Sequence, residues 1–413
     1  MARLAINGGD PVRSRPFTAW PVFGREEEDG LISVLRSGHW GRLTGGEAAR
    51  FETRFAAEHG ASHGVAVVTG TTALRIALLA SGIEAGDEVI VPPYTFLATA
   101  TAVVEANGVP VFADIDETTF SLDPAAVEAA ITPRTRAVIP VHLGGLPADM
   151  DAINALARKH DLVVIEDACH AHGARYRGRP VGSLGNMACF SFQATKNMTS
   201  GEGGIILSRD DGLAAQCVSI HNCGRVPEGA WYEHHTISGN FRMTEFQGAV
   251  LNAQLDRLGA QSETRWQNGR WLAAFLEDVP GITPQGPIEE GTRHAHHLFP
   301  FRYDAAVYGV PRQRYLDALC AEGVPVGGGY ETPLYRQPVF VNRAFGPYTG
   351  WQSSRPDLDY TRVSCPVCER ISGEEGAWFD QHVLLGSAED LRDVADAFQK
   401  VHEYRGELAS DDA

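Results

Sequence analysis

One lysine is the strongest candidate for covalent chemistry in this chain. Lys196 ends the segment 191–196, and a Gly-Glu-Gly-Gly stretch follows at 201–204. Upstream, an apolar run at 163–165 leads into Glu166 and Asp167. A lysine amine can form a Schiff base with an aldehyde, and a carboxylate can pair with a pyridine nitrogen so that the ring withdraws electrons. A strand-end Asp167 followed by Lys196 in a glycine-bounded loop therefore predicts a site for pyridoxal 5'-phosphate.

Both residues also have ordinary interpretations. A lysine in a polar loop is usually solvated, and Asp167 could cap a helix or pair with an arginine. However, a carboxylate buried at a strand end without an opposite charge is unfavourable, and a cationic ring nitrogen would offset that penalty. Lys196, once released from the cofactor, could move a proton between substrate and cofactor carbons as a general acid/base. We therefore interpret Asp167 and Lys196 as catalytic residues.

A phosphate site is predicted from hydroxyl residues at a strand-to-helix junction. Thr71 and Thr72 follow Gly70, where an apolar run gives way to a helical pattern. The first N–H groups of a helix have no partner within the helix, and together with the two hydroxyls they favour a phosphate group. An ordinary helix N-cap is the alternative. Ser191 could add a further hydroxyl to the same phosphate.

Other side chains are candidates for contact with the cofactor ring. Phe96 could stack on a flat ring or pack in the core. His170 could contact the ring or its phenolic oxygen, whereas His172 is interpreted as structural. Asn240 follows Gly239, and its residue type alone indicates only a turn.

The elements that would position these residues alternate between strands and helices. Short β-branched runs and helical stretches alternate from about residue 60 to 210, which predicts an α/β fold with a mostly parallel sheet covered on both faces. In such sheets ligands bind at the carboxyl ends of the strands, where Thr71, Asp167 and Lys196 all fall. Strands are expected at 65–68, 88–91, 109–113, 138–142, 162–166, 188–192 and 204–207, and helices at 73–79, 98–106 and 150–160.

The last third of the chain has a different pattern. A long helical pattern from about 244 to 276 precedes a stretch rich in Gly and Pro at 280–287, which indicates a change of domain. A strand near 298–303 and helices near 312–322 and 388–401 then predict a smaller α+β unit. We expect a large cofactor-binding domain at 1–278, which includes an N-terminal segment, and a small C-terminal domain at 279–413.

Composition argues against several classes of protein. The 413 residues are 44% hydrophobic and 21% charged, as in an ordinary globular protein, and the net charge of -17 argues against nucleic acid as a partner. The sequence has neither a signal-peptide pattern nor an apolar run long enough for a membrane span. Its seven cysteines are scattered and odd in number, which suits a reducing cytoplasm. Cys365 and Cys368 have no second pair at zinc spacing, so no metal site is expected.

Taken together, these motifs resemble the DegT/DnrJ/StrS family of sugar aminotransferases. That family has the fold-type I, aspartate aminotransferase-like architecture of enzymes that use pyridoxal 5'-phosphate. The resemblance extends over nearly the whole chain, from about Trp20 to Leu385. Each matching block is unspecific alone, but their combination is highly specific. The blocks lie at 70–74, 86–92, 95–96, 140–143, 166–173, 191–192, 196, 201–204 and 240–243.

The resemblance implies a role for each candidate residue. Lys196 would carry the cofactor, and Asp167 would hold its ring nitrogen. Phe96 would stack on the ring, and His170 would lie near the phenolic oxygen. Asn240 would reach the phosphate bound by a neighbouring subunit, which implies a homodimer with shared active sites. The phosphate contacts within one chain would come from Thr71, Thr72 and Ser191.

The implied reaction is a transamination in two stages. Glutamate or glutamine would convert the cofactor to pyridoxamine 5'-phosphate, and a ketone on a nucleotide-linked sugar or a cyclitol would then take the amine. Within the family, the chain is similar to scyllo-inosose aminotransferases and aminohydroxybenzoate synthases, so a role in aminosugar, aminocyclitol or antibiotic biosynthesis is expected. Three aromatic residues in predicted loops could line the acceptor pocket or pack in the core: Trp40, Tyr330 and Tyr335.

Two alternatives to transamination remain open at this point. Some family members replace the lysine with histidine and are dehydratases, but Lys196 is present here. A dehydratase or lyase that uses the same cofactor would need no amino donor, so its amine balance would distinguish it. A non-catalytic regulator that binds the cofactor would need a DNA- or partner-binding module, which neither the acidic charge nor the chain layout supplies.

Overall fold

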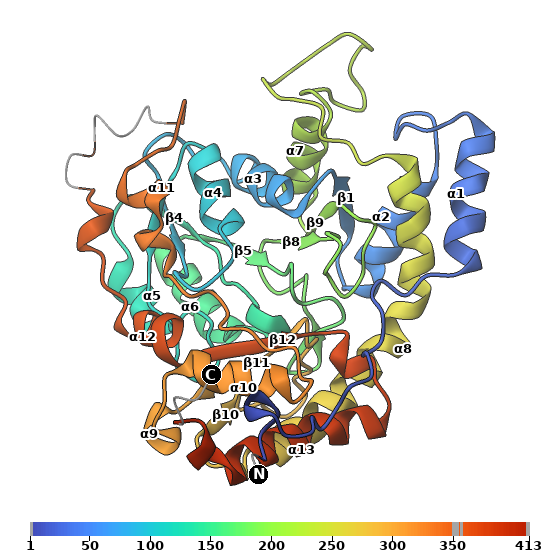
Figure 1. Cartoon of the computed structure of the whole chain (residues 1–413). Helices are drawn as coiled ribbons and strands as arrows, with labels where there is room; N and C mark the ends of the chain where they lie inside the picture. Colours follow the sequence, from blue (N-terminus) through green and yellow to red (C-terminus); the bar gives the residue numbers. More distant parts are fainter. Residues whose placement is uncertain (1–2, 349–354, 356–357, 410–413) are drawn as a thin grey trace.

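A seven-stranded sheet forms the centre of the molecule in the computed structural model, which describes residues 3–348, 355 and 358–409 (Figure 1). In spatial order, the strands are β1 (His63–Val67), β9 (Gly204–Ser208), β8 (Met187–Ser191), β5 (Val163–Asp167), β4 (Thr135–Val138), β2 (Glu88–Val91) and β3 (Val109–Phe112). The last five of these run parallel, whereas β9 is antiparallel to both of its neighbours. The predicted α/β fold with a mostly parallel sheet is therefore confirmed.

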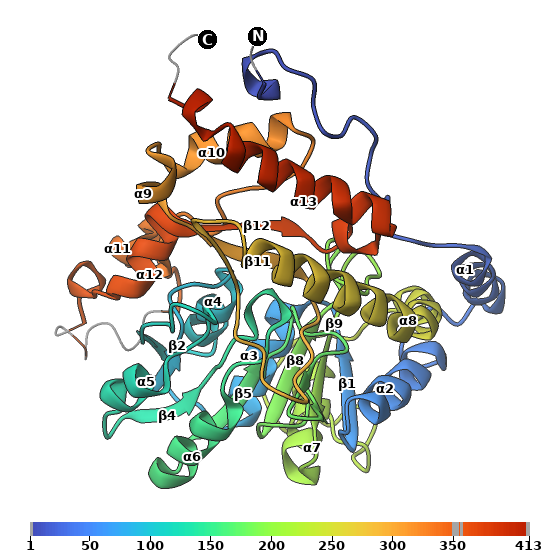
Figure 2. The same ribbon diagram turned by 90° about the horizontal axis from the view of Figure 1, so that it is seen from below.

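Helices cover both faces of this sheet (Figures 1 and 2). One core lies between the sheet and α3 (Gly70–Ala80), α4 (Ala98–Glu105) and α7 (Asp211–His221). A second core lies on the other face, under α2 (Glu47–Glu58), α5 (Pro124–Ala130), α6 (Met150–His160) and α8 (Glu245–Leu276). Because both faces are covered, strands β2, β8 and β9 are buried along their whole length.

Helix α8 connects this part of the molecule to the C-terminal part. It begins with a capping box: the Thr244 hydroxyl accepts from the Gln247 N–H, and the Gln247 side chain accepts from the Thr244 N–H. Helices α1 (Arg25–Ser37) and α2 pack against it, and α1 lies at the edge of the molecule in Figure 2. Its last turns bring Leu272 and Leu276 into the C-terminal core.

The C-terminal part contains a three-stranded antiparallel sheet. Its elements are β10 (Ile282–Pro284), β11 (Leu298–Tyr303), β12 (Gly376–Asp380), α9 (Ala305–Tyr308), α10 (Arg312–Ala321) and α13 (Ala388–Glu403). Two short helices, α11 (Pro338–Val341) and α12 (Pro366–Arg370), lie between β11 and β12 in sequence. Around them, Tyr335, Phe340 and Tyr360 belong to a core of the large sheet. The C-terminal residues thus contribute to two cores, and the domain limits 1–278 and 279–413 stay a prediction.

Two local features differ from the sequence-based expectations. The strand expected at 138–142 ends earlier, because β4 covers Thr135–Val138 and Pro140 has no N–H to continue the ladder. A small hairpin, formed by β6 (Arg175–Tyr176) and β7 (Arg179–Pro180), was not expected. Among the described residues, no helix is long and apolar enough to cross a membrane.

Candidate active site

A cavity of about 510 Å³ opens at the carboxyl ends of β5 and β8. This is the edge where ligands bind in α/β sheets. The start of α3, the segment before α4 and the loop after β8 supply one wall, and residues between 297 and 380 supply another. The cavity brings together seven of the residues singled out in the sequence: Thr71, Phe96, Asp167, His170, Ser191, Lys196 and Tyr330.

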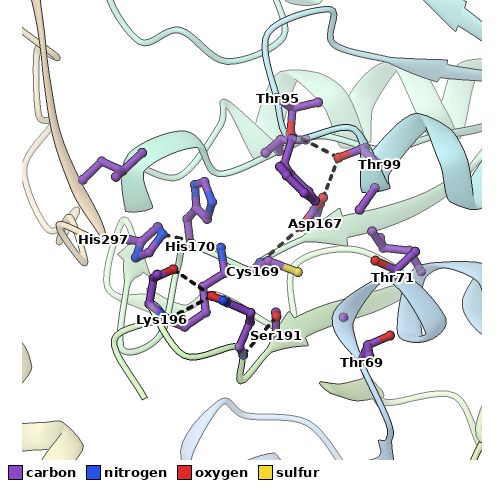
Figure 3. A pocket seen from close by; sticks show the side chains of 18 of the residues that line it. Thr69, Thr71, Thr95, Thr99, Asp167, Cys169, His170, Ser191, Lys196 and His297 are labelled. Atoms are coloured by element: carbon purple, nitrogen blue, oxygen red, sulfur yellow. Dashed lines mark hydrogen bonds between the residues drawn. The ribbon is translucent and has the colours of Figure 1, made fainter. Parts of the chain in front are cut away.

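Asp167 is a buried carboxylate at the last position of β5, with only 5% of its surface exposed. One carboxylate oxygen accepts a hydrogen bond from the Thr99 hydroxyl at 2.8 Å, and the other accepts from the Cys169 N–H at 3.2 Å (Figure 3). No lysine, arginine or histidine in the described part of the chain forms an ion pair with it. A buried carboxylate without a cation is unfavourable, so Asp167 is available for a cationic ligand atom.

Lys196 lies in the loop after β8, with its Nζ 3.4 Å from Nε2 of His297. Burial lowers the pKa of Lys196, while the thiol of Cys169 and the carboxylates of Asp167 and Asp380 oppose that shift. No carboxylate of the described residues forms an ion pair with the amine. A lowered pKa increases the neutral fraction of an amine, which is the form that attacks a carbonyl.

The N-terminus of α3 approaches the end of β8 very closely. A Cβ on Gly70 would lie 2.7 Å from Cβ of Ser191, so only glycine fits there. Thr69, which the sequence analysis did not single out, is the N-cap: its hydroxyl accepts from the Thr72 N–H at 3.1 Å. The Thr72 hydroxyl lies 2.9 Å from that of Thr69 and does not line the cavity, whereas Thr71 does. The free N–H groups of this helix start can therefore bind an anion.

The geometry around His170 defines its tautomer. The Gly144 N–H donates to Nδ1 of His170 at 3.3 Å, so the proton of the neutral ring is on Nε2. Burial and the nearby Lys196 hold the pKa of His170 well below its usual range, which keeps the ring neutral. Phe96, also at the cavity, is 62% exposed and has a ring face available for stacking. His172 lies outside the cavity lining and packs against Phe190 and other aromatic rings.

Besides Thr72, three predicted contact residues lie outside this cavity. Tyr335 is fully buried, and its hydroxyl donates to Glu369 and accepts from the Cys365 N–H. Trp40 packs against Phe246, with ring centroids 5.8 Å apart. Asn240 is exposed beyond α7, and its side chain accepts from the Arg242 N–H. Their proposed roles stay predictions, and the role of Asn240 requires a second subunit.

Besides Thr69, the cavity is lined by further polar residues that were not among the predicted contacts, including Thr99, Cys169, His297 and Asp380. His297 belongs to the segment His294-Ala295-His296-His297, where three histidines in four residues were the available signal. Thr99 lies four residues after Thr95 at the start of α4, and the two hydroxyls are 3.1 Å apart. For Asp380, at the end of β12, the sequence carried no comparable signal.

A comparison with protein families decides the broader assignment. A model of the DegT/DnrJ/EryC1/StrS aminotransferase family matches residues 22–375. The chain belongs to this family. The resemblance noted in the sequence is therefore confirmed, and so are its consequences: the protein is an aminotransferase with the fold of the enzymes that use pyridoxal 5'-phosphate.

Three relatives illustrate the similarity. An L-glutamine:2-deoxy-scyllo-inosose aminotransferase from Streptoalloteichus tenebrarius is 39% identical over 98% of this chain and 99% of its own length. A second protein of that organism is 41% identical over 97% of this chain and 98% of its own, and is provisionally named L-glutamine:3-amino-2,3-dideoxy-scyllo-inosose aminotransferase. The crystal structure of a 3-amino-5-hydroxybenzoic acid synthase superposes with a TM-score of 0.85 at 36% identity, covering 95% of this chain and 100% of that one.

The residues of the cavity fit the cofactor of this family. Asp167 is buried without a cation and can hold a protonated ring nitrogen. Lys196 is buried without a carboxylate partner and can bind an aldehyde. The hydroxyls of Thr71 and Ser191 line the cavity beside the start of α3, whose first N–H groups can bind a phosphate.

Proposed function

We propose that this aminotransferase moves an amino group from L-glutamine to the ketone of a keto-cyclitol. The charge of the cavity carries the proposal. Among the described residues that line it, Lys196 is the only lysine or arginine, whereas Asp167, Glu202 and Asp380 are carboxylates. A nucleotide-linked sugar would bring a diphosphate into this acidic cavity, which like charges disfavour. An uncharged or cationic polyol suits the cavity better, in line with the acceptors in the names of two relatives.

The donor follows from the same charges. The side chain of glutamate ends in a carboxylate, and that of glutamine ends in a carboxamide. The carboxylates of Asp380 and Glu202 would repel the first and could accept hydrogen bonds from the second. The names of the same two relatives specify L-glutamine as well. Glutamine is therefore the proposed donor.

Five residues of the cavity would each contribute one interaction with the cofactor. Asp167 would hold the ring nitrogen, and the Nε2–H of His170 would donate to the phenolic oxygen. The helix start at Thr71, with the hydroxyl of Ser191, would bind the phosphate. Phe96 would cover one face of the ring. When bound, pyridoxal 5'-phosphate supplies the electron-withdrawing ring and carries the amino group between donor and acceptor.

Lys196 is the proposed proton carrier. Its Nζ would take the proton from the donor α-carbon and later deliver one to the acceptor carbon. Burial lowers the pKa of Lys196, which makes the free amine available to accept that proton.

A homodimer with shared sites is the proposed assembly. Helix α1 exposes Leu31, Ile32 and Leu35, and the segment before Asn240 exposes Trp231 and Tyr232, which are 80% and 76% accessible. Exposed apolar groups of this kind are typical of protein–protein interfaces. Asn240 lies outside the cavity of its own chain, as a contact to a neighbouring subunit requires. Mixing Lys196→Ala with Asn240→Ala protein should restore activity through hybrid dimers, whereas sites confined to one chain would give no restoration.

A cytoplasmic location is proposed as well. It rests on the seven cysteines, all of which are free thiols in the structure. Thiols of this number persist in a reducing compartment.

Isotope transfer tests the proposed reaction. Protein loaded with the cofactor is incubated with L-glutamine labelled with ¹⁵N at the α-amino group and with 2-deoxy-scyllo-inosose, and the products are analysed by mass spectrometry. We expect a ¹⁵N-labelled amino-cyclitol and the 2-oxo acid of glutamine, both absent with Lys196→Ala. An aromatic or dehydrated product without ¹⁵N would instead support the second candidate, a synthase or dehydratase like the structural relative.

A further inference from the structure

A second histidine lies against the reactive amine. His297 directly precedes β11 and is 5% exposed, and its Nε2 is 3.4 Å from Nζ of Lys196. Its ring centroid is 4.3 Å from that of His170. Figure 3 shows His170, His297 and Lys196 grouped on the side of the cavity away from Thr69 and Thr71. The contact to the amine is therefore part of the cavity wall.

The hydrogen bonds of Asn197 define which nitrogen of His297 carries the proton. The Asn197 Nδ2 donates to the Ala295 carbonyl at 2.8 Å, which leaves Oδ1 to face Nδ1 of His297 at 3.2 Å. An amide oxygen only accepts, so Nδ1 of His297 must be protonated. Its Nε2 then has a lone pair, and that lone pair faces Lys196. Because burial holds the pKa of His297 well below its usual range, the ring stays neutral and keeps this arrangement.

We propose that His297 is a positioning residue for Lys196, whose Nζ donates a hydrogen bond to its Nε2. This inference rests on the proposed role of Lys196 as proton carrier. When Nζ takes a proton from the substrate carbon it becomes an ammonium, and an uncharged acceptor binds an ammonium more strongly than an amine. The proton stays on Nζ until it is returned to carbon, so His297 is never protonated. The acceptor both directs Nζ and stabilises its charged form.

Other charged or titratable groups also affect the pKa of Lys196, and their effects must be distinguished from that of His297. Asp167 and Asp380 favour the ammonium from β5 and β12, and Cys169 does so from the loop after β5. The neutral His170 is on that same loop. These groups stay in place when only residue 297 is changed.

The titration of Lys196 in the apoprotein tests the proposal without substrate. The chain has three lysines, Lys159, Lys196 and Lys400, so lysine labelled with ¹³C at Cε gives three NMR signals. Lys159 and Lys400 form ion pairs with Glu128 and Glu322 and are internal controls. The signal of Lys196 is assigned by its absence in Lys196→Arg.

His297→Leu removes the acceptor, and we expect the measured pKa of Lys196 to fall by about one. His297→Gln provides an acceptor oxygen near the position of Nε2 and should restore most of that difference. His294→Leu, which changes a buried histidine of the same segment outside the cavity lining, should leave the titration of Lys196 unchanged.

Two results would overturn the proposal. One is an unchanged Lys196 titration in His297→Leu while Lys159 and Lys400 titrate normally. The other is an equal fall in His294→Leu and His297→Leu, which would show a general loosening of the segment. Neither readout involves a donor or an acceptor. If glutamine and keto-cyclitol fail as substrates while the titrations follow the expectation, the proposed function fails and the contact stands.

Discussion

The variant Asp167→Asn tests two effects of the buried carboxylate separately: its effect on the stability of the apoprotein and its contribution to cofactor binding. Asparagine has the same shape, and its oxygen can accept from the Cys169 N–H as the carboxylate does at 3.2 Å. Its amide nitrogen then faces the Thr99 hydroxyl, which can accept from it and donate to the Thr95 hydroxyl 3.1 Å away. Both hydrogen bonds are thus retained in the apoprotein. Because an unpaired buried charge is removed, we expect the apoprotein to be equally or more stable.

In contrast to the stability of the apoprotein, the affinity for pyridoxal 5'-phosphate should decrease in Asp167→Asn. The variant exchanges a charge-assisted hydrogen bond to a ring nitrogen, worth about 1.5–3 kcal/mol, for a neutral one, worth about 0.5–1.5 kcal/mol. The difference of about 1–1.5 kcal/mol corresponds to roughly 5- to 13-fold weaker binding. Denaturant unfolding of the apoprotein gives the first quantity, and titration with pyridoxal 5'-phosphate followed by absorbance gives the second. Destabilisation of the apoprotein by more than about 2 kcal/mol would show that Asp167 has a cationic partner before the cofactor binds. Unchanged affinity would show that it does not hold the ring.

Three further outcomes are expected. Lys196→Ala should slow the half-reaction with glutamine by at least about 10²- to 10⁴-fold, as loss of a general acid/base does, measured as the absorbance change in stopped flow. Asp380→Asn should improve use of glutamate relative to glutamine by about 3- to 10-fold, since removing a like charge is worth about 1 kcal/mol, measured as the ratio of kcat/KM values. Burial lowers the pKa of His59 to about 4, so between about pH 4 and pH 6.5 the unfolded chain binds a proton that the folded one does not. The free energy of unfolding should therefore decrease between about pH 6.5 and pH 4. In His59→Phe this decrease should be smaller by about 3 kcal/mol, measured by urea unfolding at each pH.

The residues that the sequence could identify are those with a local signal. Asp167 ends a buried strand and Lys196 lies in a glycine-bounded loop, so both could be placed at a carboxyl edge without knowledge of the rest of the fold. The strand Glu88–Val91 and the helix Met150–His160 were predicted at their observed limits for the same reason. Hydrophobic periodicity and helix capping depend only on residues close together in the sequence, so they can be recognised without knowledge of the tertiary fold.

The residues that the sequence could not place depend on long-range packing. His297 and Asp380 reach Lys196 from the C-terminal sheet, across more than 100 residues of chain. Tyr330 and Tyr335 were equivalent in the sequence, yet one lines the cavity and the other bonds Glu369 in a core. The tertiary fold determines whether the ring of a loop residue faces the cavity or a core, and no local sequence pattern predicts it.

The arrangement of the proposed phosphate site links cofactor binding to assembly. Within one chain, the groups that face this end of the cavity are the N–H groups of α3 and the hydroxyls of Thr69, Thr71 and Ser191. Each helix-terminus interaction contributes only about 0.3–1 kcal/mol, so a dianionic phosphate gains little from one chain alone. Since Lys196 is the only lysine or arginine that lines the described cavity, we expect further phosphate contacts from a second subunit. Asn240 is exposed beyond α7, so in the proposed dimer it could supply such a contact, and cofactor binding would then depend on assembly.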